Sequence, residues 1–180
     1  MTESARVYDL DGTLVRLAVD WPAAERAIEA VVRDAGLVDD PSGSDVWTLY
    51  DVARAHGVGD EVEATLAEFE RDGAENAHRL PAADDLSELS MPVGVCSLNC
   101  EAACHIALET HDLDGVVDVV VGRDTVERRK PHPEPLLAAV RGLDADPADT
   151  LFVGDSESDE ICADRAGTRF AYVEDRQSGR

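Results

Sequence analysis

Two carboxylates one residue apart, Asp9 and Asp11, follow a short apolar run near the start of the chain. Side chains alternate faces along a strand, so these two acids point the same way if the strand continues through them. Gly12 follows at once and indicates a turn, because glycine adopts a positive φ at little cost. Two acids at the end of a buried strand are costly unless a positive charge compensates them. The stretch therefore predicts a site for a metal ion or a phosphate group.

Polar residues recur where two later apolar runs end. Ser97 and Asn99 follow the run at 93–96, and Asp155 follows the run at 150–153. In open α/β sheets, ligands bind outside the carboxyl ends of the strands. We therefore expect these side chains to meet the two acids in one crevice, although they lie far apart in the sequence.

The chain is strongly acidic: 39 Asp and Glu against 16 Lys and Arg give a formal charge of −23. Such a surface repels polyanions, so nucleic acids and anionic membranes are not expected as partners. The composition suits a halophilic cytoplasm, where concentrated salt screens the self-repulsion. All but one of the 16 cations are Arg, and the exception is Lys130. A composition that has otherwise dropped Lys indicates a special role for Lys130.

The length of 180 residues suits one domain with a small insertion. No apolar run approaches the ~18 residues of a membrane-spanning helix. Residues 1–6 lack a secretory pattern, so we expect a cytoplasmic protein. Disulfides are not expected there. Cys100 and Cys104, with His105 beside them, are interpreted as buried small residues rather than as a zinc site, which needs a second ligand pair.

From residue 91 onward, apolar runs alternate with helical patterns. Together with the first run at 5–9, these runs predict a buried parallel sheet with helices on both faces, a Rossmann-like α/β fold. The expected strands are 93–96, 116–121, 150–153 and 170–173, and the expected helices are 100–111, 133–141 and 157–166.

Residues 16–85 contain three helical stripes and no clear strand. Asp20 is expected to cap the first helix, with Pro22 in its first turn. The third stripe is expected to bury Val62, Leu66 and Phe69. We interpret residues 16–85 as an all-helical cap inserted after the first strand, and residues 1–15 and 86–180 as the core.

The motifs resemble those of the haloacid dehalogenase-like (HAD) hydrolases. Asp9-Leu10-Asp11-Gly12-Thr13 is similar to the first motif of that family, Ser97 to the second, Lys130 to the third, and the acidic stretch 154–159 to the fourth. Their order is that of the family. The helical insertion between the first and second motifs resembles the cap of the phosphoglycolate-phosphatase-like branch.

The resemblance implies a role for each acid. Asp9 is the expected nucleophile, forming an aspartyl-phosphate, and Asp11 is the expected general acid and base. Mg²⁺ is the implied cofactor, held by the carboxylates of Asp9 and Asp155 and by the main-chain carbonyl of Asp11. Asp159 is expected behind these ligands, orienting a metal-bound water or Lys130.

The resemblance also implies the phosphate contacts, which comprise Gly12, Thr13, Ser97, Asn99 and Lys130. Ser97 is expected to donate a hydrogen bond to a phosphoryl oxygen, and Lys130 to act as a point charge on the transferring group. The family often has Asn directly after the second-motif Ser or Thr, whereas here Leu98 intervenes. Asn99 therefore either faces the site or caps the following helix.

The function implied is a Mg²⁺-dependent phosphatase that hydrolyses a small phosphorylated metabolite, phosphoglycolate by analogy with the branch. The alternatives are a phosphoglucomutase-like phosphotransferase, a haloacid dehalogenase and a catalytically silent HAD-fold binding module. The acid at Asp11 argues against a dehalogenase, which attacks carbon and needs neither that acid nor a metal. Arg16, Arg54 and His56 are either ligands for an anionic substrate tail or, the interpretation we favour, part of a solvated surface.

Overall fold

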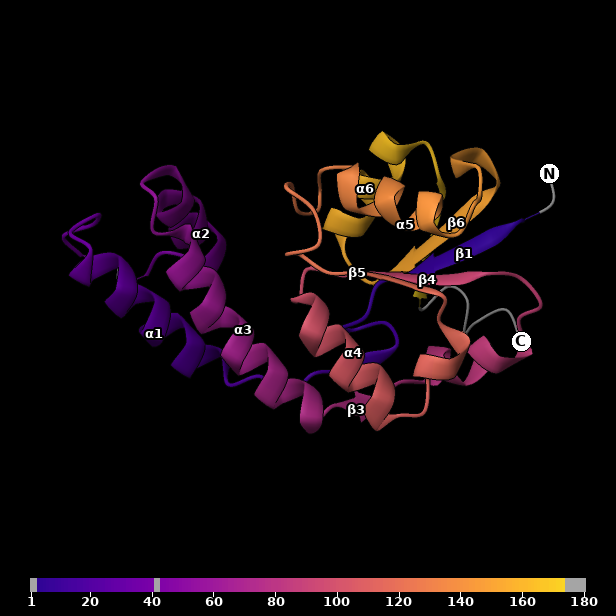
Figure 1. Ribbon diagram of the computed structural model, residues 1–180, viewed down its shortest axis with the longest axis horizontal. Coiled ribbons are helices and arrows are strands. Elements are labelled where there is room, and N and C mark those ends of the chain that lie inside the picture. The colour runs from indigo at the N-terminus through magenta and orange to yellow at the C-terminus, as the bar shows by residue number, and fades with distance from the viewer. Residues whose placement is uncertain (1–2, 41–42, 174–180) are drawn as a thin grey trace.

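The computed structural model describes residues 3–40 and 43–173. Its centre is a five-stranded parallel sheet in the order β5-β4-β1-β6-β7, as the sequence pattern predicts (Figure 1). The strands are β1 (Ala5–Tyr8), β4 (Val93–Cys96), β5 (Val119–Val121), β6 (Thr150–Gly154) and β7 (Arg169–Tyr172). Strand β1 pairs with both β4 and β6, so the sheet centre joins the start of the chain to its second half.

Helices cover both faces of the sheet. Helices α5 (Glu134–Gly142) and α6 (Glu157–Ala166) lie on one face, and α4 (Glu101–Thr110) lies on the other (Figure 1). Side chains alternate accordingly: Val7 of β1 belongs to the hydrophobic cluster under α5 and α6, whereas Tyr8 belongs to the cluster under α4. The 3-10 helices η1 (Pro81–Glu88), η2 (Asp114–Val116) and η3 (Pro147–Asp149) complete the connections.

Three helices follow β1 and precede β4. They are α1 (Trp21–Asp34), α2 (Val46–Ala55) and α3 (Gly59–Glu75). They enclose a hydrophobic cluster of their own, and α1 and α2 project away from the sheet while α3 runs back to α4 (Figure 1). The side chain of Asp20 accepts a hydrogen bond from the Ala23 N–H at 3.0 Å, which confirms the predicted cap of α1.

The expectation of no strand in this region is wrong in one respect. Two-residue strands β2 (Val15–Arg16) and β3 (His78–Arg79) pair antiparallel where the chain leaves the core and returns to it. A pair this short leaves no periodic pattern in the sequence. The predicted strand at 116–121 is also too long, because η2 occupies its first residue and β5 begins at Val119.

The third helical stripe, which forms α3, differs from the prediction at one position. Val62 and Leu66 are buried as expected, but Phe69 is only half-buried and the next residue, Glu70, is fully buried. All four cysteines are buried and free, as expected of small apolar residues. Within the described residues, no helix combines the length and the apolar character needed to cross a membrane.

Candidate active site

The carboxyl ends of three neighbouring strands bring the predicted residues together. Asp9 directly follows β1, Ser97 directly follows β4, and Asp155 directly follows β6. They line one cavity of about 220 Å³. The cavity is lined by Asp9, Asp11, Trp21, Trp47, Glu70, Ser97, Leu98, Asn99, Lys130, Asp155 and Ser156.

Lys130 lies at the buried end of this cavity, with 3 % of its surface exposed. Its ammonium donates to Asp9 Oδ1 at 2.8 Å, to Asp159 Oδ1 at 2.5 Å and to the Cys96 carbonyl at 3.0 Å. An ammonium has three N–H donors, so each one has a partner. The three acceptors surround a compact cation, which a planar guanidinium would not match. This geometry gives a physical reason for a single retained Lys.

The charges of this cluster are coupled. Burial raises the pKa of Asp9 to about 7; Lys130 opposes that rise, and the charge of Asp159 adds to it. Burial alone lowers the pKa of an ammonium, but the charges of Asp9 and Asp159 raise the pKa of Lys130 above its ordinary value. Lys130 therefore stays charged beside a carboxylate that binds its own proton unusually well.

Asp159 belongs to the first turn of α6 and is fully buried. Its Oδ1 accepts from Lys130, and its Oδ2 accepts from the Ser156 hydroxyl at 2.6 Å in a capping box. A Cβ atom at Gly154 would lie 2.6 Å from this carboxylate, so only glycine leaves room for it. Asp159 is thus held against Lys130 by α6 itself.

The acids fit a divalent metal ion. Oxygen atoms of Asp9, Asp155 and Asp159 lie within 4.8 Å of one another. A Cβ at Gly12, where φ is +85°, would lie 2.0 Å from Asp155 Oδ2, so this glycine lets the Asp155 carboxylate approach the turn. Hard oxygen donors of this kind suit Mg²⁺. Since both oxygens of Asp159 already have partners, Asp9 and Asp155 are the carboxylates with capacity for the ion.

Asp11 lies in the same cavity but is not one of the clustered acids. Its Oδ1 accepts a hydrogen bond from the Leu17 N–H at 2.9 Å, which fixes the side chain across the turn. Burial raises the pKa of Asp11, an effect that this hydrogen bond and the charge of Arg16 only partly offset. A carboxyl group with a raised pKa is better suited to donate a proton.

Ser97 and Asn99 form a buried pair. The Ser97 hydroxyl donates to Asn99 Oδ1 at 3.0 Å and accepts from the Asn99 N–H at 3.1 Å. The Asn99 amide also donates to Glu70 Oε1 at 3.4 Å. Helix α4 has Cys100 at its N-cap without a side-chain cap. Asn99 therefore does not cap the helix, and it faces the cavity instead.

Gly12 and Thr13 are placed differently from the other predicted phosphate contacts. The Gly12 N–H donates to the Val15 carbonyl at 2.8 Å, and the Thr13 N–H donates to the Leu10 carbonyl at 3.2 Å. Both amides are thus used inside the turn. Neither residue is among those that line the cavity. Thr13 is fully buried, and its hydroxyl has no hydrogen-bond partner within the described part of the chain.

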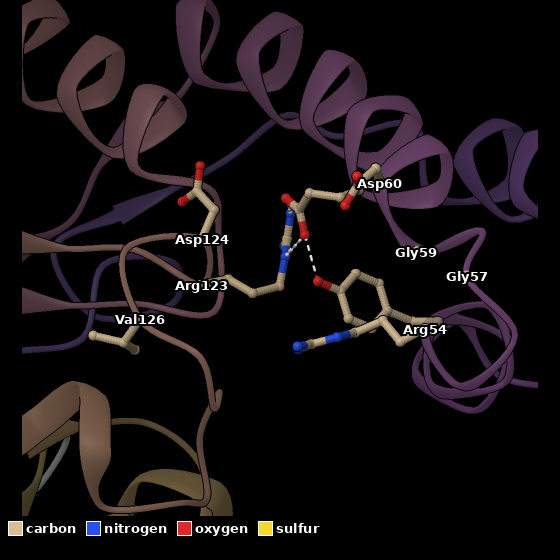
Figure 2. A pocket seen from close by; sticks show the side chains of 9 residues that line it. Arg54, Gly57, Gly59, Asp60, Arg123, Asp124 and Val126 are labelled. Carbon is tan, nitrogen blue, oxygen red and sulfur yellow. Dashed lines mark hydrogen bonds and ion pairs between the residues drawn. The ribbon is translucent and has the colours of Figure 1, made fainter.

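A second buried ion cluster adjoins the cavity, and the sequence reasoning missed it. Arg123, in the loop after β5, donates to both oxygens of Glu70 and of Glu63 on α3, at distances from 2.5 to 3.0 Å. It also donates to the Leu98 carbonyl at 2.6 Å. Figure 2 shows Arg123 reaching across to α3 in a neighbouring cavity, which Tyr50 and Glu63 also line. The Tyr50 hydroxyl donates to Glu63 at 2.6 Å.

Two sequence signals pointed to this cluster. Arg123 stands two residues after an apolar strand, as the other strand-end residues do, and Glu70 interrupts the buried stripe of α3. Glu70 also accepts from the Cys100 N–H at 2.9 Å. The cluster thus joins α3 to the loop that carries Ser97 and Asn99.

Comparisons with known proteins agree with this arrangement. The sequence model of the "Haloacid dehalogenase-like hydrolase" family matches residues 66–173, a range that contains Ser97, Lys130 and Asp155. Pyrophosphatase PpaX from Bacillus thuringiensis (strain Al Hakam) is 38 % identical over 96 residues, which cover 53 % of this chain and 44 % of that protein. The match therefore spans less than half the length of that relative.

Solved structures share the fold. A predicted phosphoglycolate phosphatase from Haemophilus somnus superposes with a TM-score of 0.61 at 22 % identity, covering 96 % of this chain and 85 % of that one. A hydrolase from Pseudomonas syringae has a TM-score of 0.67 at 20 % identity, covering 93 % and 83 %. With the family match over more than half of its residues, the chain belongs to the haloacid dehalogenase-like hydrolases.

Proposed function

We propose that this protein is a Mg²⁺-dependent phosphomonoester hydrolase that works through an aspartyl-phosphate on Asp9. The observation that carries the proposal is the buried Lys130 ammonium between Asp9 and Asp159, at the cavity that Asp11, Ser97 and Asp155 also line. A carboxylate, a cation and oxygen ligands for a metal at one strand edge are the groups that phosphoryl transfer needs.

The carboxylates of Asp9 and Asp155 and the main-chain carbonyl of Asp11 would hold the Mg²⁺. When bound, the ion would offset the repulsion between the Asp9 carboxylate and the anionic phosphoryl group. Lys130 keeps one oxygen of Asp9 in place through its 2.8 Å hydrogen bond, and Asp159 keeps Lys130 in place in turn. The nucleophile is therefore held before the substrate arrives.

The reaction divides between the two acids of the first motif. An oxygen of Asp9 forms a bond to phosphorus, the bond from phosphorus to the leaving oxygen breaks, and Asp11 donates a proton to that oxygen. A water molecule then attacks phosphorus, Asp11 accepts its proton, and Asp9 is regenerated with release of inorganic phosphate. Ser97 is the side-chain donor for a phosphoryl oxygen, since its hydroxyl can turn from Asn99 to the substrate.

Residues 16–85 are proposed as a substrate-contacting cap. This segment contributes Trp21, Trp47 and Glu70 to the cavity, while the strand ends of the core contribute the reacting groups. The acidic composition and the scarcity of Lys support an enzyme adapted to concentrated salt, so assays belong in molar salt as well as in dilute buffer.

The test is hydrolysis of p-nitrophenyl phosphate by the wild-type protein, with Mg²⁺ and after chelation. We expect release of nitrophenol and of inorganic phosphate in equal amounts, and loss of both on chelation. A protein that releases no product with Mg²⁺ in either salt condition would contradict the proposal. Release of nitrophenol without phosphate, with the phosphoryl group passed to an added alcohol or sugar, would instead identify a phosphotransferase.

A further inference from the structure

The cavity that holds the reacting groups also has a distinctive outer lining. The chain contains two tryptophans, Trp21 and Trp47, and both line this cavity from the inserted helices. Trp21 begins α1 and, at 36 % exposure, is the exposed large hydrophobic residue of the described chain. Trp47 lies in the first turn of α2 and is half-buried. An exposed indole that lines a cavity gives a ligand an apolar surface to cover, and covering it is favourable.

Apart from the proposed Mg²⁺, the described residues that line this cavity offer a substrate no free cation. Among the described residues that line it, Lys130 is the single cation, and Asp9, Asp159 and the Cys96 carbonyl occupy its three donors. Glu70 adds a carboxylate, already paired with Arg123. A second anionic group on the substrate would thus be desolvated without a partner, which costs free energy.

The arginines near the cavity are already paired. Arg129 lies 5.1 Å from the centroid of the Trp47 ring and binds Asp51. Arg123 lies 5.7 Å from the same centroid and binds Glu63 and Glu70. Arg54 lines two other cavities, of about 370 and 440 Å³, and Arg128, Arg129 and Arg165 line the larger one. The neighbouring Lys130 contributes to that wall as well, but its ammonium is held by Asp9 and Asp159. Arg16, which the sequence left open as a ligand for an anionic tail, lines none of these cavities.

The size of the catalytic cavity limits the leaving group. About 220 Å³ must hold the phosphoryl group and whatever is attached to it. Sites for drug-sized ligands occupy roughly 300–1,000 Å³, so this cavity suits a smaller molecule. A leaving group of about one ring is in keeping with this volume.

We propose that the substrate is a small phosphomonoester whose leaving group is an uncharged single ring with an apolar face, stacked against Trp21, with Trp47 beside it. The shared chemistry is a flat apolar ring face, which either an aryl group or a monosaccharide presents to an indole. Phosphoglycolate and pyrophosphate, which carry a second anion, are poor substrates on this account. The proposal rests on the proposed phosphatase function and deepens it.

The test compares primary phosphate esters with similar leaving alcohols. Benzyl phosphate has a neutral ring as its leaving group, and 4-carboxybenzyl phosphate has a ring with a negative charge. Ethyl phosphate has no ring, and phosphoglycolate has a carboxylate but no ring. Glucose 6-phosphate provides a neutral sugar ring. We expect kcat/KM for benzyl phosphate or glucose 6-phosphate to exceed the values for the other three by about tenfold or more. Equal or higher kcat/KM for phosphoglycolate would overturn the inference while leaving the phosphatase function intact.

Substitutions of Trp21 test whether its indole contacts the ring of the substrate. Trp21→Leu should raise KM for the preferred ring ester by about fivefold or more, with a smaller change in kcat, and should affect ethyl phosphate less. Trp21→Phe keeps an aromatic face and should recover most of the loss. Equal losses for the ring ester and ethyl phosphate, or no recovery by Phe, would contradict a stacking role.

Binding gives an independent readout, because both tryptophans of the chain line the cavity and their fluorescence reports its occupancy. The Asp9→Asn variant with Mg²⁺ is titrated with each ester. We expect the ring esters to change the fluorescence at lower concentration than phosphoglycolate does. If no ester is hydrolysed by the wild type, the phosphatase proposal fails, but this titration still decides whether the cavity prefers a neutral ring.

Discussion

Two buried clusters in this molecule place one cation between two carboxylates, and they differ in what surrounds the cation. Lys130 joins Asp9 to Asp159 at the strand ends, whereas Arg123 joins Glu63 to Glu70. In the first cluster, burial raises the pKa of Asp9 to about 7. In the second, burial would raise the pKa of Glu63, but hydrogen bonds and charge from Arg123 hold it below its ordinary range.

The pKa values of Asp9 and Glu63 shift in opposite directions because the two cations donate different numbers of hydrogen bonds. The fork of Arg123 supplies paired hydrogen bonds to both glutamates and another to the Leu98 carbonyl, so the second cluster is fully satisfied. Lys130 gives Asp9 a single hydrogen bond, and the carboxylate lies at a cavity beside Asp155. We infer that the Lys130 cluster takes part in catalysis, whereas the Arg123 cluster holds α3 against the core.

The sharpest contrast between the clusters is in catalysis. Asp9→Asn should lower kcat by about 10³-fold or more, because it removes the nucleophile. Glu63→Gln, the matched change in the other cluster, should lower kcat by less than about tenfold. Rates of p-nitrophenyl phosphate hydrolysis measure both, with circular dichroism to check folding. Similar losses in the two variants would remove the distinction.

For the stability of the fold, we expect the Arg123 cluster to matter more than the Lys130 cluster. Arg123→Met leaves the buried Glu70 and the half-buried Glu63 without their cation and should lower the free energy of unfolding by about 3–5 kcal/mol. Adding Glu70→Gln to that variant should recover part of the loss, since one buried charge is then removed. Urea unfolding in molar salt measures both. A loss below about 1 kcal/mol would show that the cluster does not fasten α3.

Exchanging the cations tests the role of donor geometry. Lys130→Arg should lower kcat by about 10²-fold, because a planar guanidinium does not match three acceptors around a compact ammonium. Arg123→Lys should keep kcat within about tenfold of the wild type while lowering stability by about 1–3 kcal/mol, since the paired hydrogen bonds are lost. Full turnover by Lys130→Arg would contradict this explanation of the single Lys.

The smallest effect is the pH dependence of Mg²⁺ binding. Asp9 must lose its proton to bind the ion, and its pKa is raised to about 7. Below that pH the protonated form competes, so Mg²⁺ affinity should rise by up to about tenfold per pH unit from pH 5 to pH 7 and then level off. Calorimetry on the wild type measures this. An affinity that stays constant from pH 5 to pH 8 would contradict the raised pKa.

Much of this arrangement was predictable from the sequence. The apolar runs gave the sheet, and the strand-end rule brought Asp9, Ser97 and Asp155 to one edge, because parallel strands end on the same side. The resemblance predicts Asp159 near Lys130, and the capping box of α6 holds it there. Lys130 is identified both as the single Lys of the sequence and by its resemblance to the third family motif, and its three contacts explain its retention.

What escaped prediction depends on contacts between distant segments. Glu70 interrupts an apolar stripe, and its burial depends on Arg123, which is 53 residues away, and on the Cys100 N–H. The apolar stripe predicts burial of Phe69, but the ion pair with Arg123 buries the neighbouring Glu70 instead. No sequence pattern distinguishes Trp21, and its place at the cavity depends on how the inserted helices lie over the strand ends.

The covalent chemistry on Asp9 is tested most directly by trapping the phosphoenzyme. The Asp11→Asn variant retains the nucleophile but lacks the base for hydrolysis, so with Mg²⁺ and p-nitrophenyl phosphate it should gain the mass of one phosphoryl group. Peptide mapping by mass spectrometry should place that group on Asp9, and Asp9→Asn should gain none. A phosphoryl group trapped by the Asp9→Asn variant, or attached elsewhere in Asp11→Asn, would contradict the account.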